Sequence, residues 1–150
     1  MKNILYFVFF LFSLPAFATD YYSIKSGNAA DVNTWNSDRN GKGTAPANFN
    51  NAADNFYVQN GSSIIAVQNF NCKGSLIIET GGIFITGNAG NTTAVGTVVT
   101  INQGGVLKLS QSTSLITGFI LIQGNLENQG GNISFSKASP VAYNSRRQNQ

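Results

Sequence analysis

The most constraining feature of this sequence is a recurring unit of about 20 residues, in which two short apolar stretches flank a glycine turn. Four segments show it: NFYVQNGSSIIAV, SLIIETGGIFITG, TVVTINQGGVLKLS and FILIQGNLENQGG. Their turn glycines Gly61, Gly81, Gly104 and Gly124 are separated by 20, 23 and 20 residues. Such a period is typical of solenoids, in which one unit is unstable alone and stacking buries a continuous apolar column.

Alternation within these segments predicts β-strands. It directs Leu76 and Ile78 to one face, as it does Val99 and Ile101. We therefore expect an all-β fold, a short right-handed parallel β-helix (β-solenoid) with an irregular N-terminal cap. The alternative is an antiparallel β-sandwich, which also uses short strands with a turn about every 8–12 residues.

The first 18 residues have the pattern of a secretory signal peptide. Lys2 supplies a positive charge, an apolar run extends from Ile4 to Leu14, and a small-x-small cleavage site ends at Ala18. The run is shorter than the roughly 20 apolar residues that a membrane-spanning helix needs. The sequence therefore predicts a signal peptide at 1–18 cleaved after Ala18, a secreted or cell-surface location, and no membrane span after cleavage.

Three regions are expected behind the signal peptide: an N-terminal cap at 19–54, β-solenoid coils at 55–135 and a polar tail at 136–150. Turn-forming residues dominate the cap, where Asn40-Gly41 is the strongest local turn signal. Cleavage removes Lys2 from the nine basic residues, which leaves eight against six acidic residues, a net charge of +2. This charge is too small to indicate nucleic-acid binding.

The composition removes several kinds of catalysis. The chain has no histidine and one cysteine, Cys72, so zinc, Cys–His and Ser–His–Asp chemistry have no residues to use. We expect no metal and no other cofactor. Glu79 and Glu127 are the only acids in the repeats, and a glycosidase needs two carboxylates about 5–10 Å apart across a cleft. Both lie beside predicted turns, where a solvated acid is usual, so no enzymatic activity is expected.

The candidate ligand-binding residues surround the single tryptophan, Trp35. Asn33, Asp38 and Arg39 lie near it in the sequence, and this mixture could stack on a sugar ring and bond its hydroxyl groups. The alternative is that Trp35 plugs the end of the solenoid, because a solenoid needs a cap that shields its terminal coil from water.

The stretch YYSIKSGNAADVNTWNSDRNGKG, followed by VQNGSSIIAV and GSLIIETGGIF, resembles the N-terminal region of secreted surface proteins from Bacteroidetes. The resemblance implies a Tyr-Tyr-Ser and Asn-Thr-Trp module that runs into parallel β-helix coils. Those proteins usually end in a type IX secretion sorting domain, which residues 139–150, SPVAYNSRRQNQ, do not resemble. A weaker similarity, to the G8 domain, is carried by Trp35, Pro46, Val58, Gly61, Leu76, Ile78 and Gly82.

These observations predict an exported, non-enzymatic structural or adhesion-type module, whose partner is an extracellular polysaccharide or a surface protein. One alternative is a carbohydrate-binding module centred on the Trp35 cap. A second is a degenerate fragment of a polysaccharide-degrading enzyme. Exposed aromatic residues on a polar face would favour glycan binding, whereas two acids facing one groove would favour the enzyme.

Overall fold

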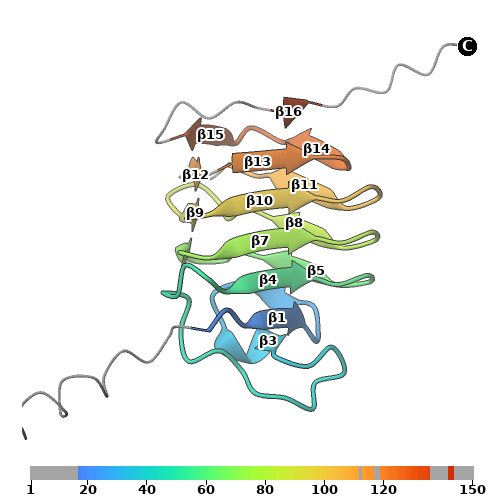
Figure 1. Ribbon diagram of the computed structural model, residues 1–150. Coiled ribbons are helices and arrows are strands. Elements are labelled where there is room, and N and C mark those ends of the chain that lie inside the picture. The colour runs from blue at the N-terminus through green and yellow to red at the C-terminus, as the bar shows by residue number, and fades with distance from the viewer. Residues whose placement is uncertain (1–16, 112, 117–118, 136–141, 144–150) are drawn as a thin grey trace, which may run out of the picture.

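The computed structural model describes residues 17–111, 113–116, 119–135 and 142–143, whose strands stack as coils of a β-solenoid (Figure 1). Sheet A contains β1 (Asp20–Ser23), β3 (Trp35–Asn36), β4 (Asn55–Val58), β7 (Ser75–Ile78), β10 (Val98–Ile101), β13 (Phe119–Ile122) and β16 (Ala142–Tyr143). Sheet B contains β2 (Gly27–Asn28), β5 (Ser63–Ile65), β8 (Ile83–Ile85), β11 (Val106–Leu109) and β14 (Asn125–Asn128). Sheet C contains β6 (Phe70–Cys72), β9 (Thr92–Val95), β12 (Thr113–Ile116) and β15 (Asn132–Phe135).

Each complete coil contributes one strand to each sheet, so β4–β6, β7–β9, β10–β12 and β13–β15 form the first to fourth coils. The front strands of Figure 1 run from left to right, and the chain returns behind them as it rises, which is a right-handed path. Strands of successive coils pair in parallel, whereas β3 pairs with β1 antiparallel. The predicted parallel β-helix is confirmed. The sandwich alternative is wrong, because each coil strand pairs with its equivalent one coil away.

Side chains that point into the coils form columns along the stack. In sheet A, Phe56, Leu76, Val99 and Ile120 are aligned by the strand register and all are buried. The predicted inward faces of β7 and β10 are therefore confirmed. Burying an aliphatic side chain of this size stabilises a fold by about 1.5–3 kcal/mol. Since each coil covers its neighbour, the columns hold the stack together without a disulfide.

The predicted turn glycines lie at the corners between sheets A and B. Three of them have the expected left-handed backbone, and the fourth does not. Gly61, Gly81 and Gly104 have φ of 76°, 75° and 79°, a left-handed backbone that favours glycine. Gly124 is not among the positive-φ glycines. The corner there is shorter, because Ile122 and Leu126 are four residues apart whereas the aligned Ile101 and Leu107 are six apart.

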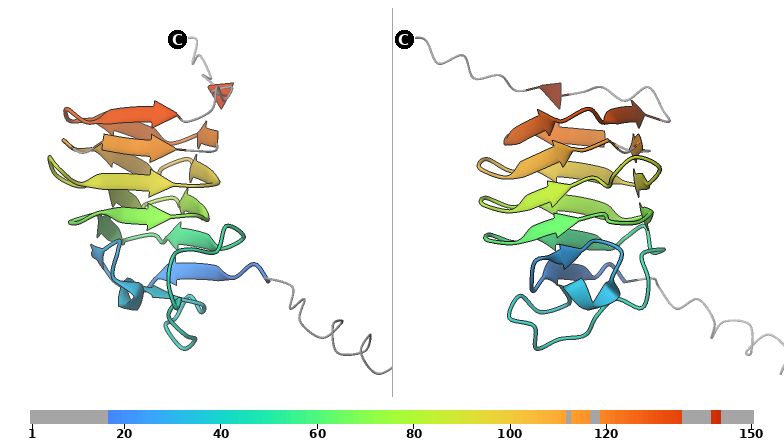
Figure 2. Two further views of the ribbon diagram at one scale, coloured as in Figure 1. Left: turned by 90° about the vertical axis from the view of Figure 1, so that its left-hand side faces the viewer. Right: turned by 180° about the vertical axis from the view of Figure 1, so that it is seen from behind.

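The N-terminal region at 19–54 both extends and covers the stack (Figure 2). Strands β1 and β2 continue sheets A and B by one step below the first complete coil. The 3₁₀ turn η2 (Val32–Thr34) then leads into β3, which lies at the end of sheet A. Beside them, the ring of Phe49 packs on Phe56 and Phe70 at centroid distances of 5.3 and 5.2 Å. Aromatic side chains from the irregular segment therefore cover the apolar column of the first coil.

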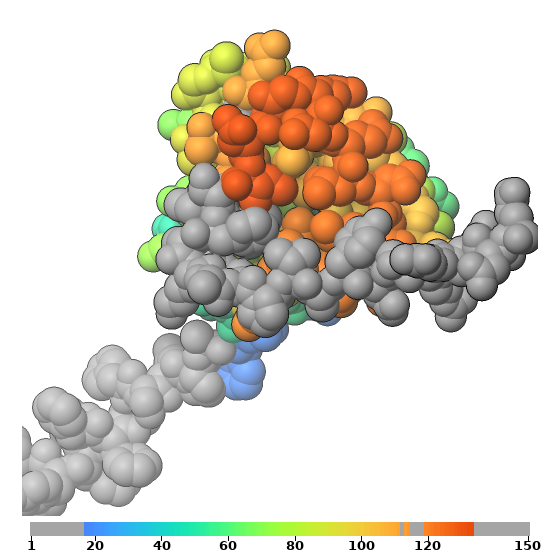
Figure 3. All heavy atoms as spheres, turned by 90° about the horizontal axis from the view of Figure 1, so that it is seen from above, coloured from blue at the N-terminus to red at the C-terminus, as the bar shows by residue number. Residues whose placement is uncertain are grey.

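The fourth coil is the last complete coil, and β16 pairs with its strand β13 at the end of sheet A. Figure 3 shows this end of the stack from above. Leu126 occupies the inward register position above Leu107, yet it is 39% exposed, whereas Leu107 is 3% exposed.

The described part of the chain contains no helix long and apolar enough to span a membrane. The predicted signal peptide and polar tail lie almost entirely outside the described residues.

Candidate functional site: a tyrosine and arginine cluster on sheet A

Of the two interpretations of Trp35, the structure contradicts stacking on a sugar and supports the plug. Trp35 is 0% exposed, and its Nε1 donates a hydrogen bond to the carbonyl oxygen of Ala29 at 2.9 Å. Its ring meets the ring of Phe56 edge-on, at 5.3 Å and 82°. Because both the ring and its polar edge are occupied inside the protein, no face remains for a ligand. Trp35 instead plugs the solenoid below the first coil.

The three other predicted ligand-binding residues do not converge on Trp35. Asp31 caps η2, where Asn33 donates to its Oδ1 from the backbone and from Nδ2 at 2.9 and 3.1 Å. Asp38 Oδ1 accepts a hydrogen bond from the backbone N of Asn40 at 2.7 Å. Asn33 and Asp38 therefore stabilise local turns. Arg39 alone makes contacts outside its own turn.

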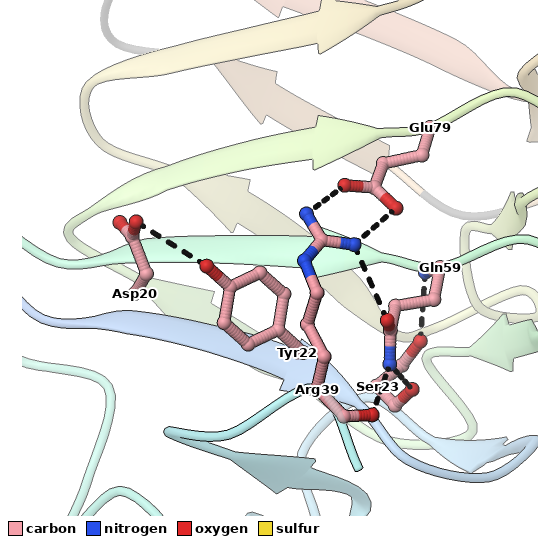
Figure 4. Close-up of polar contacts among 6 residues, drawn as sticks. All are labelled: Asp20, Tyr22, Ser23, Arg39, Gln59 and Glu79. Atoms are coloured by element: carbon pink, nitrogen blue, oxygen red, sulfur yellow. Dashed lines mark hydrogen bonds and ion pairs between the residues drawn. The ribbon is translucent and has the colours of Figure 1, made fainter.

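Arg39 reaches from the cap region to the second coil (Figure 4). Its guanidinium group forms a two-pronged contact with the Glu79 carboxylate, with Nη1–Oε2 and Nη2–Oε1 distances of 2.9 and 2.5 Å. It also donates to Gln59 Oε1 at 3.3 Å. This hydrogen bonding raises the pKa of Arg39 above its ordinary value, with partial burial acting in the opposite direction. Arg39 therefore stays charged, and it fastens the cap to two successive coils.

Two tyrosines lie beside this ion pair. Tyr22 and Tyr57 face each other in the register of β1 and β4, with stacked rings 5.0 Å apart. The guanidinium carbon of Arg39 is 4.2 Å from the Tyr22 ring centroid and 5.8 Å from that of Tyr57. Such cation–π contacts stabilise a partly exposed site by about 0.5–1 kcal/mol. Both tyrosines are half-buried, so part of each ring still meets solvent.

Polar groups flank the two tyrosines on the same strands. Asp20 Oδ1 accepts from Asn55 Nδ2 at 2.9 Å, and Asp20 Oδ2 lies 3.4 Å from the Tyr22 hydroxyl. Burial raises the pKa of Tyr57 above its usual range, and the negative charge of Asp20 raises it further. We call Asp20, Tyr22, Arg39, Asn55, Tyr57 and Glu79 the tyrosine–arginine cluster. It combines aromatic surface with carboxylate, amide and guanidinium groups on one outer face.

Sequence reasoning found Arg39 and missed the two tyrosines as a pair. The strand DYYS of β1 and the strand NFYV of β4 share a polar–aromatic–Tyr order. That likeness was a usable signal, because equivalent positions in adjacent coils lie side by side. It was obscured because Tyr22 and Tyr57 are 35 residues apart, whereas the next equivalent pair, Tyr57 and Ile77, is 20 residues apart.

The two acids of the repeats lie in different places and have different partners. Glu79 follows β7 and binds Arg39, whereas Glu127 lies within β14 of sheet B, 3.4 Å from the Nζ of Lys108. Each carboxylate is therefore paired with a basic side chain and not with a second acid. Within the described residues, no group of three or more Cys, Asp or Glu side chains is placed to hold a metal ion.

Cys72 lies in β6 and its side chain is buried. Burial raises the pKa of the thiol to about 12, although a backbone hydrogen bond with Gly74 acts in the opposite direction. The neutral thiol is therefore the form present at ordinary pH. It packs as a small apolar side chain.

Comparisons with protein-family models, with curated proteins and with solved structures found no match. The class of this protein, a short capped β-solenoid, therefore rests on the geometry of its fold alone.

Proposed function

We propose that this protein is an exported, non-enzymatic structural or adhesion-type module that presents a stiff β-surface outside the cell. The observation that carries the proposal is the stacking of four coils in register, with an aromatic plug at the N-terminal end. Such a stack resists bending, because each coil is bonded to the next along three sheets. A stiff stack with β-sheet faces is better suited to holding a partner on its surface than to catalysis in a cleft.

Export is the first part to test. The full chain is produced in a bacterial host, and the N-terminus of the exported protein is sequenced. Cleavage after Ala18, giving Thr19 as the first residue, is expected from the small-x-small site. Substitution of Ala18 by Arg should block processing. Retention of the unprocessed wild-type chain in the cytoplasm would contradict the proposal.

Attachment is the second part. Cells that display the protein are compared with cells that lack its gene, for adherence to surfaces coated with extracellular polysaccharide or with surface protein. More adherent cells are expected when the protein is present. Equal adherence on every coating, with the protein shown at the surface by antibody labelling, would contradict an adhesive role.

A second candidate function is glycan binding, and the tyrosine–arginine cluster favours it. Sugar rings stack on aromatic side chains, and their hydroxyl groups bond to carboxylates, amides and guanidinium groups. The cluster offers both on the outer face of sheet A, unlike the buried Trp35. This places the candidate contact near the N-terminal end of the rod.

The test is isothermal titration of the protein with a panel of soluble polysaccharides. Glycan binding predicts saturable heat with at least one of them, and a loss of affinity of about tenfold or more in Tyr57→Ala. The matched control is Ile85→Ala, a half-buried side chain on the outer face of sheet B. Binding that both variants retain would move the site away from the cluster.

A further inference from the structure

The interior of the solenoid contains a cavity lined mainly by residues of the second and third coils, with Ile133 of the fourth coil. It leaves about 20 Å³ for the centre of a water-sized molecule. Its walls are mostly apolar and include Phe84, Val99 and Leu107. One water molecule needs roughly 10–15 Å³ on this measure, so the cavity has room for one and not for a larger ligand.

Three side chains in the lining carry a hydroxyl group, those of Thr86, Thr93 and Ser114, and the last two have no partner among the described residues. Thr93 and Ser114 are 4% exposed, and they occupy aligned inward positions in β9 and β12. Their hydroxyl oxygens are buried and have no hydrogen-bond partner within the described protein. An unpartnered buried hydroxyl costs about 1–3 kcal/mol, so two adjacent ones indicate a shared partner.

The spacing of the strands fits a bridging molecule. Neighbouring strands lie about 4.8 Å apart, which is longer than one hydrogen bond and close to the span of two bonds of about 2.8 Å through a shared oxygen. Thr86 also lines the cavity. Its Oγ1 accepts from the backbone N of Ser110 at 2.9 Å, which leaves its own proton free to donate. Three hydroxyl-bearing residues therefore line the cavity.

We propose that this cavity is a binding site for a single water molecule, held by the hydroxyl groups of Thr93 and Ser114. Water can both donate and accept, so it pairs with hydroxyl groups in either orientation. An apolar occupant would leave both hydroxyls unsatisfied, and a charged occupant would lack a counter-charge among the lining residues. The bound water acts as part of the core and links the second coil to the third.

The direct test is a crystal structure of the full chain at about 1.5 Å resolution. The expected result is a spherical density peak within about 2.6–3.2 Å of both hydroxyl oxygens. The variant Thr93→Ser retains the hydroxyl and should retain the peak, whereas Thr93→Val should lose it or weaken it. An empty cavity, or two hydroxyls bonded directly to each other, would overturn the proposal.

A double-mutant cycle in solution tests the same site through stability. With a shared water, Thr93→Val and Ser114→Ala should each lower the folding equilibrium constant by about fivefold. In the double variant the folding equilibrium constant should fall by less than the product of the two single decreases, because the first substitution already weakens binding of the water. Thr92→Val, on the exposed side of the same strand, is the matched control and should change little. Single variants that raise the folding constant, with effects that multiply, would show that the hydroxyls are unsatisfied and would overturn the proposal.

Discussion

Replacing Gly105 by alanine tests how closely the coils approach each other at the glycine corners. An added Cβ would lie 2.7 Å from the carbonyl oxygen of Ile78 and 2.9 Å from that of Glu79, both in the coil below. Gly105 does not have a positive φ, so backbone conformation contributes nothing to the cost. Only the lack of space between coils opposes the substitution.

The destabilisation by Gly105→Ala can be estimated from the movement that the added methyl group forces on the coils. To relieve these contacts, the third coil must rise by a few tenths of an ångström. That movement stretches the bonds from Val106 N to Gly82 O (3.0 Å) and from Asn102 N to Ile78 O (2.9 Å). Overpacking costs about 1–3 kcal/mol and each weakened backbone bond about 0.5–1.5 kcal/mol. We expect Gly105→Ala to cost about 3 kcal/mol.

Gly61→Ala is the matched control. Gly61 has φ of 76°, and an added Cβ there would meet nothing within 4 Å. Its cost is the left-handed conformation alone, about 1–2 kcal/mol, partly offset by a stiffer unfolded chain.

The assay is urea unfolding followed by far-UV circular dichroism, with the fluorescence of Trp35 as a second signal. With a slope of about 2 kcal/mol per molar urea, Gly105→Ala should move the midpoint down by about 1.5 M and Gly61→Ala by about 0.5 M. Two signals are needed because repeat proteins can unfold in parts, and Trp35 reports only on the capped end. If Gly105→Ala cost no more than Gly61→Ala, the close approach of the coils would not be what requires glycine at this corner.

Three further predictions concern the cap, the ion pair and the thiol. Because Trp35 is fully buried, its emission should be blue-shifted and unaffected by iodide, and Trp35→Ala should cost about 3–5 kcal/mol; emission typical of exposed tryptophan would contradict the plug. Arg39→Ala should cost about 1 kcal/mol, because the Arg39 side chain is 48% exposed and solvent screens the pair. A double-mutant cycle with Glu79→Gln should give a coupling of about 0.5 kcal/mol, and strict additivity would show that the pair contributes nothing. For Cys72, the pKa of the folded thiol, raised from 9.0 to about 12, means that the native state keeps a proton which the unfolded chain loses, so stability falls as pH rises above 9. At pH 10 this loss is about 1.4 kcal/mol. When the free energy of unfolding is measured across pH 8–10, it should decline less steeply for Cys72→Ala than for the wild type. Parallel curves for the two proteins would contradict the effect.

The repeat period favoured the coil architecture over the sandwich, because stacking requires the same apolar positions in each coil. Leu76, Ile78, Val99 and Ile101 could be assigned to the interior from alternation alone, and they are buried. The corner at Gly124 could not be placed in this way. A glycine two residues after a strand looks the same in the sequence whether its corner spans four residues or six, and only the register across sheet B distinguishes them.

The candidate site depended far more on the tertiary structure. The sequence placed Trp35, Asn33, Asp38 and Arg39 in one group because they are neighbours along the chain, but neighbours in an irregular segment point in different directions. Arg39 instead meets Glu79, forty residues further on, and lies beside Tyr22 and Tyr57.

By itself, the sequence determined the exclusion of histidine-dependent chemistry, favoured the class of fold and predicted an export signal, because these depend on periodicity and composition. Only the tertiary structure decided that Trp35 is a plug, which residues share the outer face of sheet A, and that Thr93 and Ser114 lie side by side inside the core. The physical reason is that coil stacking brings together residues about 20 positions apart, and their exact alignment depends on the length of every corner between them.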